Sequence, residues 1–127
     1  MVPHVTLLYG GLLGLLIAVL GINVTRLRVK LKVDADHEAP KPLFFAIRAH
    51  GNAVEWAPFL IALLLVLELS GASALWLHVA GGALFLGRLL HAVGFVTRLK
   101  TAVPGILVTW LVAVWVPVWA LLRHFGG

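Results

Sequence analysis

The sequence contains no cysteine among its 127 residues. This absence excludes a disulfide bond, a protein thiol nucleophile and a cysteine metal site. The six histidines do not form a metal-ligand set either, so we expect no metal site. Any sulfur chemistry must therefore come from a bound ligand.

Charge is also scarce, because only 12% of the residues are charged whereas 61% are hydrophobic. A soluble domain has about a quarter of its residues charged and about half apolar. The apolar residues fill nearly the whole chain and leave no polar stretch long enough to fold alone. These proportions exclude a soluble protein and predict one integral membrane domain over 1–127, surrounded by membrane lipids.

Four apolar runs are each long enough for a helix that crosses about 30 Å of hydrocarbon. The predicted fold class is therefore all-α, a four-helix membrane bundle. A very short turn after residue 69 makes the two central helices an antiparallel hairpin. The segment 26–42 reads as a solvated loop, because it is rich in charge and contains two prolines. The expected helices span about 5–25, 42–69, 74–97 and 103–123.

The net charge of +5 has a topological explanation. Lys and Arg lie in the first and third connections, whereas Arg123 is the only basic residue expected at the opposite end. By the positive-inside rule the two basic connections are cytoplasmic and both termini lie on the far side. The bases lie beside apolar runs and form no continuous patch, so we expect no nucleic-acid partner.

Five polar residues lie where the predicted helices should be apolar, and we call them the polar ladder. Arg48, Asn52 and Glu55 share one face of the helix 42–69. Arg88 and His91 share one face of the helix 74–97. Depths counted from the cytoplasmic loops place Glu55 level with Arg88. The pair could simply fix helix register as a buried ion pair, whereas the whole ladder suits a zwitterionic ligand with carboxylates and an amine.

The stretch Ile47–Pro58, which reads IRAHGNAVEWAP, and the stretch Gly87–His91, which reads GRLLH, resemble the MAPEG family. These are membrane-associated proteins in eicosanoid and glutathione metabolism, and the likeness is to their small bacterial branch. The resemblance implies a homotrimer in a bacterial inner membrane, with glutathione bound between subunits near the cytoplasmic face. By this resemblance, six residues of this chain correspond to glutathione contacts of the family: Arg26, Arg48, Asn52, Glu55, Arg88 and His91.

The chain departs from the family pattern at three places. Gly51 stands where family members that act on eicosanoids have a second arginine, and Phe95 stands where a tyrosine is common. The stretch 102–105 lacks the arginine that helps to activate the thiol. The catalytic residue is therefore unknown. The nearest substitutes by sequence are Arg98, Lys100 and Thr101, and Thr25 and Thr109 are weaker ones. The alternative is that all of them are ordinary residues of the membrane interface.

The leading functional hypothesis is a glutathione transferase or peroxidase that acts on lipophilic electrophiles or lipid hydroperoxides. The alternative is a non-catalytic binding or regulatory membrane protein with the same fold. A third hypothesis is a small proton-coupled exporter. The exporter is disfavoured because the first helix has no acid and because Arg88 would hold Glu55 ionised.

Three other residue groups have structural interpretations. Glu68 is expected to reach water from the end of its helix, and His50 to contact a loop or a lipid headgroup. Gly87 and Gly94 are expected to let the helix 74–97 approach a neighbour closely.

Overall fold

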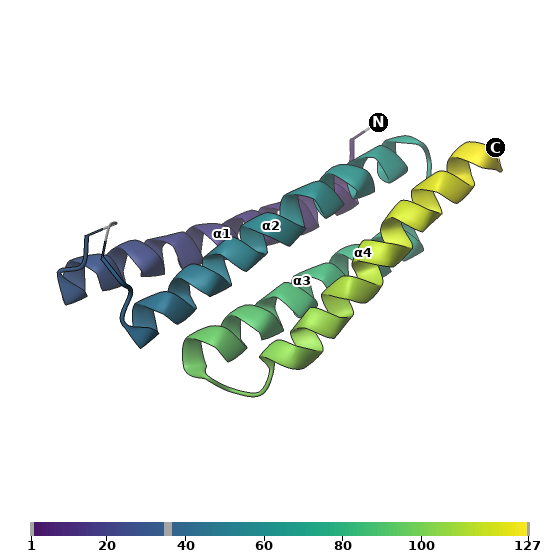
Figure 1. Ribbon diagram of the computed structural model, residues 1–127. Helices are drawn as coiled ribbons and strands as arrows, with labels where there is room; N and C mark the ends of the chain where they lie inside the picture. Colours follow the sequence, from purple (N-terminus) through teal and green to yellow (C-terminus); the bar gives the residue numbers. More distant parts are fainter. Residues whose placement is uncertain (1, 35–36, 127) are drawn as a thin grey trace.

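The computed structural model describes residues 2–34 and 37–126, and its secondary structure is helical throughout. Each helix is long and apolar enough to cross a membrane, which confirms the predicted four-helix bundle. The third helix has the predicted bounds, the second begins one residue early, and the fourth begins one residue early and ends two residues late. The helices are α1 (His4–Leu31), α2 (Lys41–Leu69), α3 (Ala74–Thr97) and α4 (Ala102–Phe125) (Figure 1).

The first helix is longer than predicted, since α1 continues to Leu31 instead of ending near residue 25. It ends where Lys32 adopts a left-handed conformation with φ of 53°. Segment 26–31 contains no glycine or proline, and Arg, Lys and Leu are good helix formers. Its charges therefore end the apolar run without ending the helix. The 28 residues of α1 span about 42 Å, so its basic turns project beyond the hydrocarbon.

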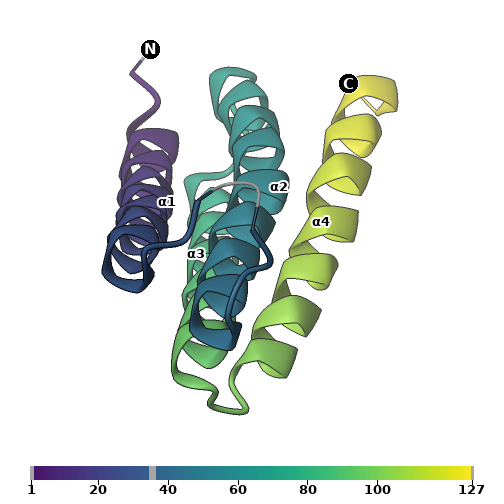
Figure 2. The same ribbon diagram turned by 60° about the vertical axis from the view of Figure 1, so that its left-hand side comes forward.

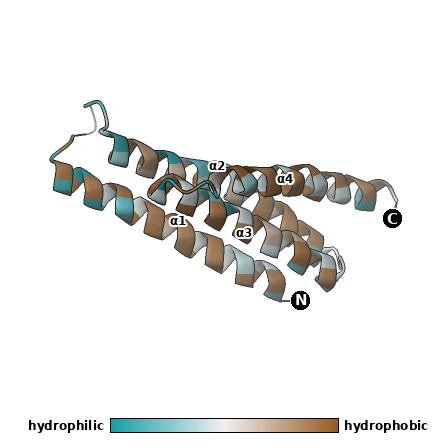
Figure 3. Ribbon diagram, turned by 90° about the horizontal axis from the view of Figure 1, so that it is seen from below, coloured by the Kyte–Doolittle hydropathy of each residue, from teal (hydrophilic) through white to brown (hydrophobic). Residues whose placement is uncertain are grey.

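The helices form an up-and-down bundle with both termini at one end (Figure 1). We call the other end, where α1 meets α2 and α3 meets α4, the loop end. Hydrophilic residues gather there on α1 and α2 (Figure 3). Within the described residues, α1 and α4 make no contact and lie on opposite sides of the α2–α3 hairpin (Figure 2). One face of the α2–α3 hairpin is thus covered by α1 and the opposite face by α4.

Glycines bring α3 and α4 into backbone contact, as expected for Gly87 and Gly94. A Cβ added to Gly94 would collide with the backbone of Ala102. A Cβ added to Gly105 would lie 2.5 Å from the backbone nitrogen of His91. Real side chains do not tolerate such distances, so these positions must lack a side chain for the two helices to pack.

Glu68 corrects the expectation that it reaches water, because only 9% of its surface is exposed. Its carboxylate accepts hydrogen bonds from the backbone nitrogens of Val5 and Thr6, at 2.9 and 2.7 Å. The Thr6 hydroxyl donates a third bond at 2.6 Å. The first turn of a helix has unpaired N–H groups and a partial positive charge. A carboxylate from the end of α2 therefore caps the start of α1.

Candidate functional site

Arg88 is the centre of the polar group inside the bundle, and only 1% of its surface is exposed. Its Nε donates to the hydroxyl of Thr109 on α4 at 2.9 Å. One terminal nitrogen donates to the Oδ1 of Asn52 on α2. The other donates to the carbonyl oxygen of Gly105 at 3.5 Å. Arg88 thus connects three helices through neutral acceptors.

The predicted pairing of Arg88 with Glu55 is wrong within one chain. Asn52 is the α2 partner of Arg88, and Glu55 is exposed. The depth count started at Lys100, three residues beyond the end of α3 at Thr97. Three residues make nearly one helical turn, about 4.5 Å, and this offset moves the partner from Glu55 to Asn52. In the single chain Arg88 therefore does not hold Glu55 ionised, and this reason against an exporter no longer applies. The other reason remains, because α1 contains no acidic residue.

The neutral partners of Arg88 leave its charge uncompensated among the described residues. A buried charge is costly unless an opposite charge or several hydrogen bonds offset the cost. Three of its five N–H groups have partners here. Because a guanidinium can only donate, Asn52 must present its oxygen to Arg88. The amide NH₂ of half-buried Asn52 is therefore left to donate elsewhere.

Arg48 and Glu55 lie one turn to either side of Asn52 on the same face of α2. Both side chains are exposed in the single chain. Glu55 is the middle residue of α2, about 21 Å from either end of the helix. Ionisable groups at such a depth cost about 2.5 to 3.5 kcal/mol each when they face lipid. This face therefore needs a polar covering.

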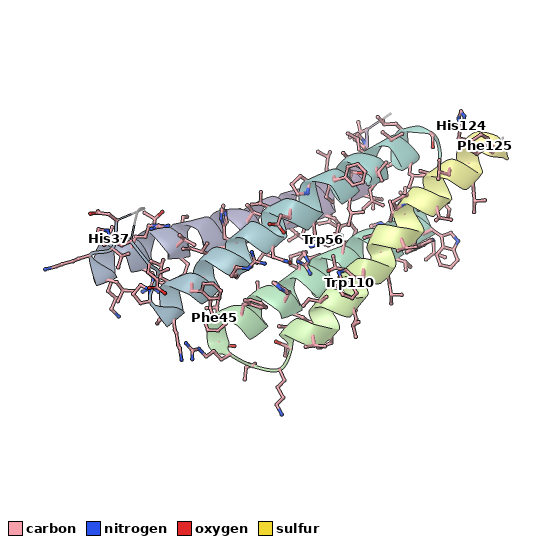
Figure 4. All side chains as sticks on the ribbon, in the orientation of Figure 1. His37, Phe45, Trp56, Trp110, His124 and Phe125 are labelled. Carbon is pink, nitrogen blue, oxygen red and sulfur yellow. The ribbon has the colours of Figure 1, made fainter. Side chains whose placement is uncertain are left out.

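His91 and three neighbours form an aromatic row towards the loop end. His91 is 2% exposed, and its ring stacks on that of Phe95 with centroids 4.4 Å apart. The Phe95 ring meets Phe45 edge-on at 6.0 Å. The guanidinium carbon of Arg98 lies 4.7 Å from the centre of the Phe45 ring. Figure 4 shows Phe45 at the start of α2, close to the end of α3.

The remaining predicted site residues do not join Arg88 in the single chain. Arg26 and Arg98 line a separate cleft of about 390 Å³ between α1, α2 and the end of α3. Lys100 is exposed in the connection between α3 and α4. His50 packs against α1 at Gly21 instead of lying in a loop. The structure therefore brings together only part of the set that the sequence suggested.

Thr109 is the residue whose importance the sequence analysis underestimated. It is fully buried, accepts from Arg88 and donates to the Gly105 carbonyl oxygen at 2.9 Å. The signal was present, because Thr109 is the one hydroxyl residue in α4, whose other residues before Arg123 are apolar. Gly105 lies in the stretch that lacks the family arginine, and its carbonyl is an acceptor for Arg88.

Comparison with known proteins supplies the family. The chain matches the MAPEG family over residues 6–123. It is 39% identical over 107 residues to the inner membrane protein YecN of Escherichia coli strain K12, a match that covers 84% of this chain and 82% of YecN. The YecN of Escherichia coli O6:H1 strain CFT073 gives the same values. No solved structure matches significantly. A family match over nearly the whole chain, with the polar ladder on α2 and α3, means that this integral membrane protein belongs to the MAPEG family.

Proposed function

We propose that the protein binds glutathione on the polar ladder and presents its thiol to lipophilic electrophiles or lipid hydroperoxides. The observation that carries this proposal is Arg88, a buried cation whose described partners are all neutral. An anionic ligand beside Asn52 offsets that charge. The membrane delivers the second substrate, and the tripeptide delivers the thiol that the cysteine-free chain lacks.

The exposed groups of the ladder match the functional groups of glutathione. Arg48 suits one carboxylate of the tripeptide, because a guanidinium pairs with a carboxylate through two parallel hydrogen bonds. The amide NH₂ of Asn52 is not used by Arg88, which bonds only the amide oxygen, and it suits the same or the second carboxylate. Glu55 suits the ammonium group. Arg88 is in this proposal a positioning residue, since it acts through Asn52.

The proposal includes a homotrimer with the two basic connections on the cytoplasmic side. Its support is the exposed carboxylate of Glu55 at the centre of a membrane-spanning helix. Facing lipid, this group would be unstable, so protein or ligand covers it. In the trimer that the family resemblance implies, a neighbouring copy of the chain covers Glu55. Cross-linking of the purified protein and protease access in oriented vesicles test the assembly and the orientation.

The first experiment is calorimetric titration of glutathione into the detergent-solubilised protein. We expect binding that Arg48→Ala weakens by about ten-fold or more, the loss of one charge-assisted contact. Lys30→Ala is the matched control, because Lys30 is also basic and exposed but lies on the projecting end of α1. Equal affinity in Arg48→Ala and Lys30→Ala would place glutathione elsewhere.

The second experiment separates an enzyme from a binding protein. We expect the protein to accelerate glutathione conjugation to a chloronitrobenzene, or reduction of a lipid hydroperoxide, above the rate in protein-free micelles. A thiol is activated when a cation lowers its pKa below about 8.5. Bound glutathione with an unshifted thiol pKa and no turnover would exclude catalysis.

A non-catalytic binding protein is the second candidate function, and one observation favours it. Arg98 lies over the Phe45 ring, and Lys100 is exposed beyond the end of α3. Neither catalytic candidate therefore lies beside Asn52 and Arg88 in the single chain. Glutathione binding without turnover is the result that selects this function.

A further inference from the structure

A second basic site lies at the loop end, in the cleft of about 390 Å³ that Arg26 and Arg98 line. Asn23 on α1 and Phe45 on α2 form two of its other walls. The described lining residues include two guanidinium groups and no carboxylate. No residue of the polar ladder lines this cleft. It is therefore an anion-attracting surface distinct from the one around Asn52.

Arg98 lines this cleft from the end of α3 and, like Lys32 at the end of α1, has a left-handed backbone conformation. It ends α3 with φ of 61°, in the left-handed region that few residues other than glycine adopt. Its guanidinium lies 4.7 Å from the centre of the Phe45 ring. A guanidinium on an aromatic face is fixed in direction while its N–H edge stays available for an acceptor. Strained residues kept at a rigid position are often functional.

Arg26 links the basic cleft to an apolar groove on α1. Its terminal nitrogen donates to the Oδ1 of Asn23 at 2.8 Å, which holds the side chain near the cleft. Arg26 also lines a groove of about 600 Å³ whose other walls include Ile17, Ala18 and Ile22. The groove follows α1 from residue 26 back to residue 17, about 13 Å towards the membrane centre. Arg26 therefore borders both the cationic cleft and an open, largely apolar groove on α1.

We propose that the cleft binds the phosphate of an anionic phospholipid, with one acyl chain of the same lipid in the groove on α1. The two guanidinium groups supply bidentate donors for phosphate oxygens. The apolar groove distinguishes a lipid from free phosphate, which has no apolar part to bury there. The proposal uses none of the ladder residues, although the family resemblance carries over Arg26 as a glutathione contact and Arg98 is a candidate for thiol activation.

The test measures binding of phosphatidylglycerol to the full-length protein in a neutral detergent by native mass spectrometry. Phosphatidylcholine, which has no net charge, is the headgroup control, and inorganic phosphate is the free-anion competitor. We expect phosphatidylglycerol to bind on the order of ten-fold more tightly than phosphatidylcholine. Inorganic phosphate should compete poorly.

Three variants locate the binding. Arg98→Gln should weaken phosphatidylglycerol binding about five-fold, and Arg98→Gly should do the same without backbone strain at this position. Lys100→Gln removes an equal charge from an exposed neighbour outside the cleft and should change the affinity by less than about two-fold. Ala18→Phe fills the groove and should weaken lipid binding with the headgroup site intact.

Several results would overturn the proposal. Equal losses in the Arg98 and Lys100 variants would mean that only overall charge matters. Equal affinity for the two lipids would exclude headgroup recognition. Unchanged binding in Ala18→Phe together with full competition by phosphate would identify a soluble anion. Glutathione binding is measured on the same Arg98 variants, so the lipid site and the ladder site succeed or fail separately.

Discussion

Replacing Glu68 by glutamine tests whether a carboxylate of α2 holds the start of α1. The amide keeps one acceptor oxygen and puts an NH₂ group where the second oxygen was. If Oε2 is the atom replaced, the two bonds at 2.7 and 2.6 Å from Thr6 are lost. The new NH₂ then faces the Thr6 N–H, and the Thr6 hydroxyl has to turn and accept instead of donate. A hydrogen bond to a charged group contributes about 1.5 to 3 kcal/mol. The attraction between the carboxylate and the helix N-terminus adds about 0.3 to 1 kcal/mol.

The neutral amide also avoids the desolvation of a buried carboxylate, which offsets part of this loss. We therefore expect Glu68→Gln to lower the free energy of unfolding by about 2 to 4 kcal/mol. For a chain of this length the Tm should fall by on the order of 10 °C. Thr6→Val, which removes only the hydroxyl donor to the carboxylate at nearly constant shape, should cost about 1.5 to 3 kcal/mol.

The assay is reversible unfolding of the purified protein in mixed detergent, with helicity and Tm followed by circular dichroism. Glu38→Gln is the control, because Glu38 is an exposed carboxylate in the connection between α1 and α2. We expect this control to stay within about 0.5 kcal/mol of the parent protein. If Glu68→Gln behaved like Glu38→Gln, the cap would not stabilise α1 and the reasoning would be refuted.

The remaining predictions concern the helix contacts and the polar ladder. Gly105→Ala should lower the Tm strongly in thermal unfolding, because its Cβ would lie 2.5 Å from a backbone nitrogen of α3, whereas Gly11→Ala, with nothing within 4 Å, should be neutral or stabilising. Arg88→Leu removes three hydrogen bonds made by a charged group, each worth about 1.5 to 3 kcal/mol. It also removes a buried charge that no described carboxylate offsets, and Thr109 keeps its bond to the Gly105 carbonyl. We therefore expect a net loss of about 1 to 3 kcal/mol, and a stability equal to that of the parent protein would contradict the network. Glu55→Gln should leave the single-chain stability nearly unchanged and weaken glutathione binding in calorimetry. An unchanged affinity for glutathione in Glu55→Gln would show that the Glu55 carboxylate is not part of the binding site.

The sequence was sufficient for the number of helices and their hairpin arrangement, because four long apolar runs leave no other structure for a membrane chain. It was insufficient for the end of α1, since a change from apolar to basic residues marks the membrane surface and does not break a helix. It also placed the ladder one turn out of register. Counting depth from Lys100, instead of from Thr97 where α3 ends as predicted, was enough to exchange Glu55 for Asn52 as the partner of Arg88.

The contacts that the sequence could not predict join residues far apart in the chain. Glu68 lies 62 residues from Thr6, and no local pattern indicates that the two meet. Gly87 and Gly94 were identified as close-packing positions because small residues permit helix contact. Only the three-dimensional structure shows that their partner is α4, at Ala102 and Gly105.

The neutral surroundings of Arg88 have a consequence for how the chain enters the membrane. An arginine near the middle of a hydrophobic segment opposes the insertion of that segment by about 2.5 to 3.5 kcal/mol. Asn52 lies on the helix that is synthesised before α3, whereas Thr109 and Gly105 lie on the helix that follows. During synthesis α3 therefore has an acceptor in α2 at first and gains the other two only when α4 arrives. Insertion of α3 should depend on α2 already being in place, so that the hairpin, and not the single helix, is the unit that enters the bilayer.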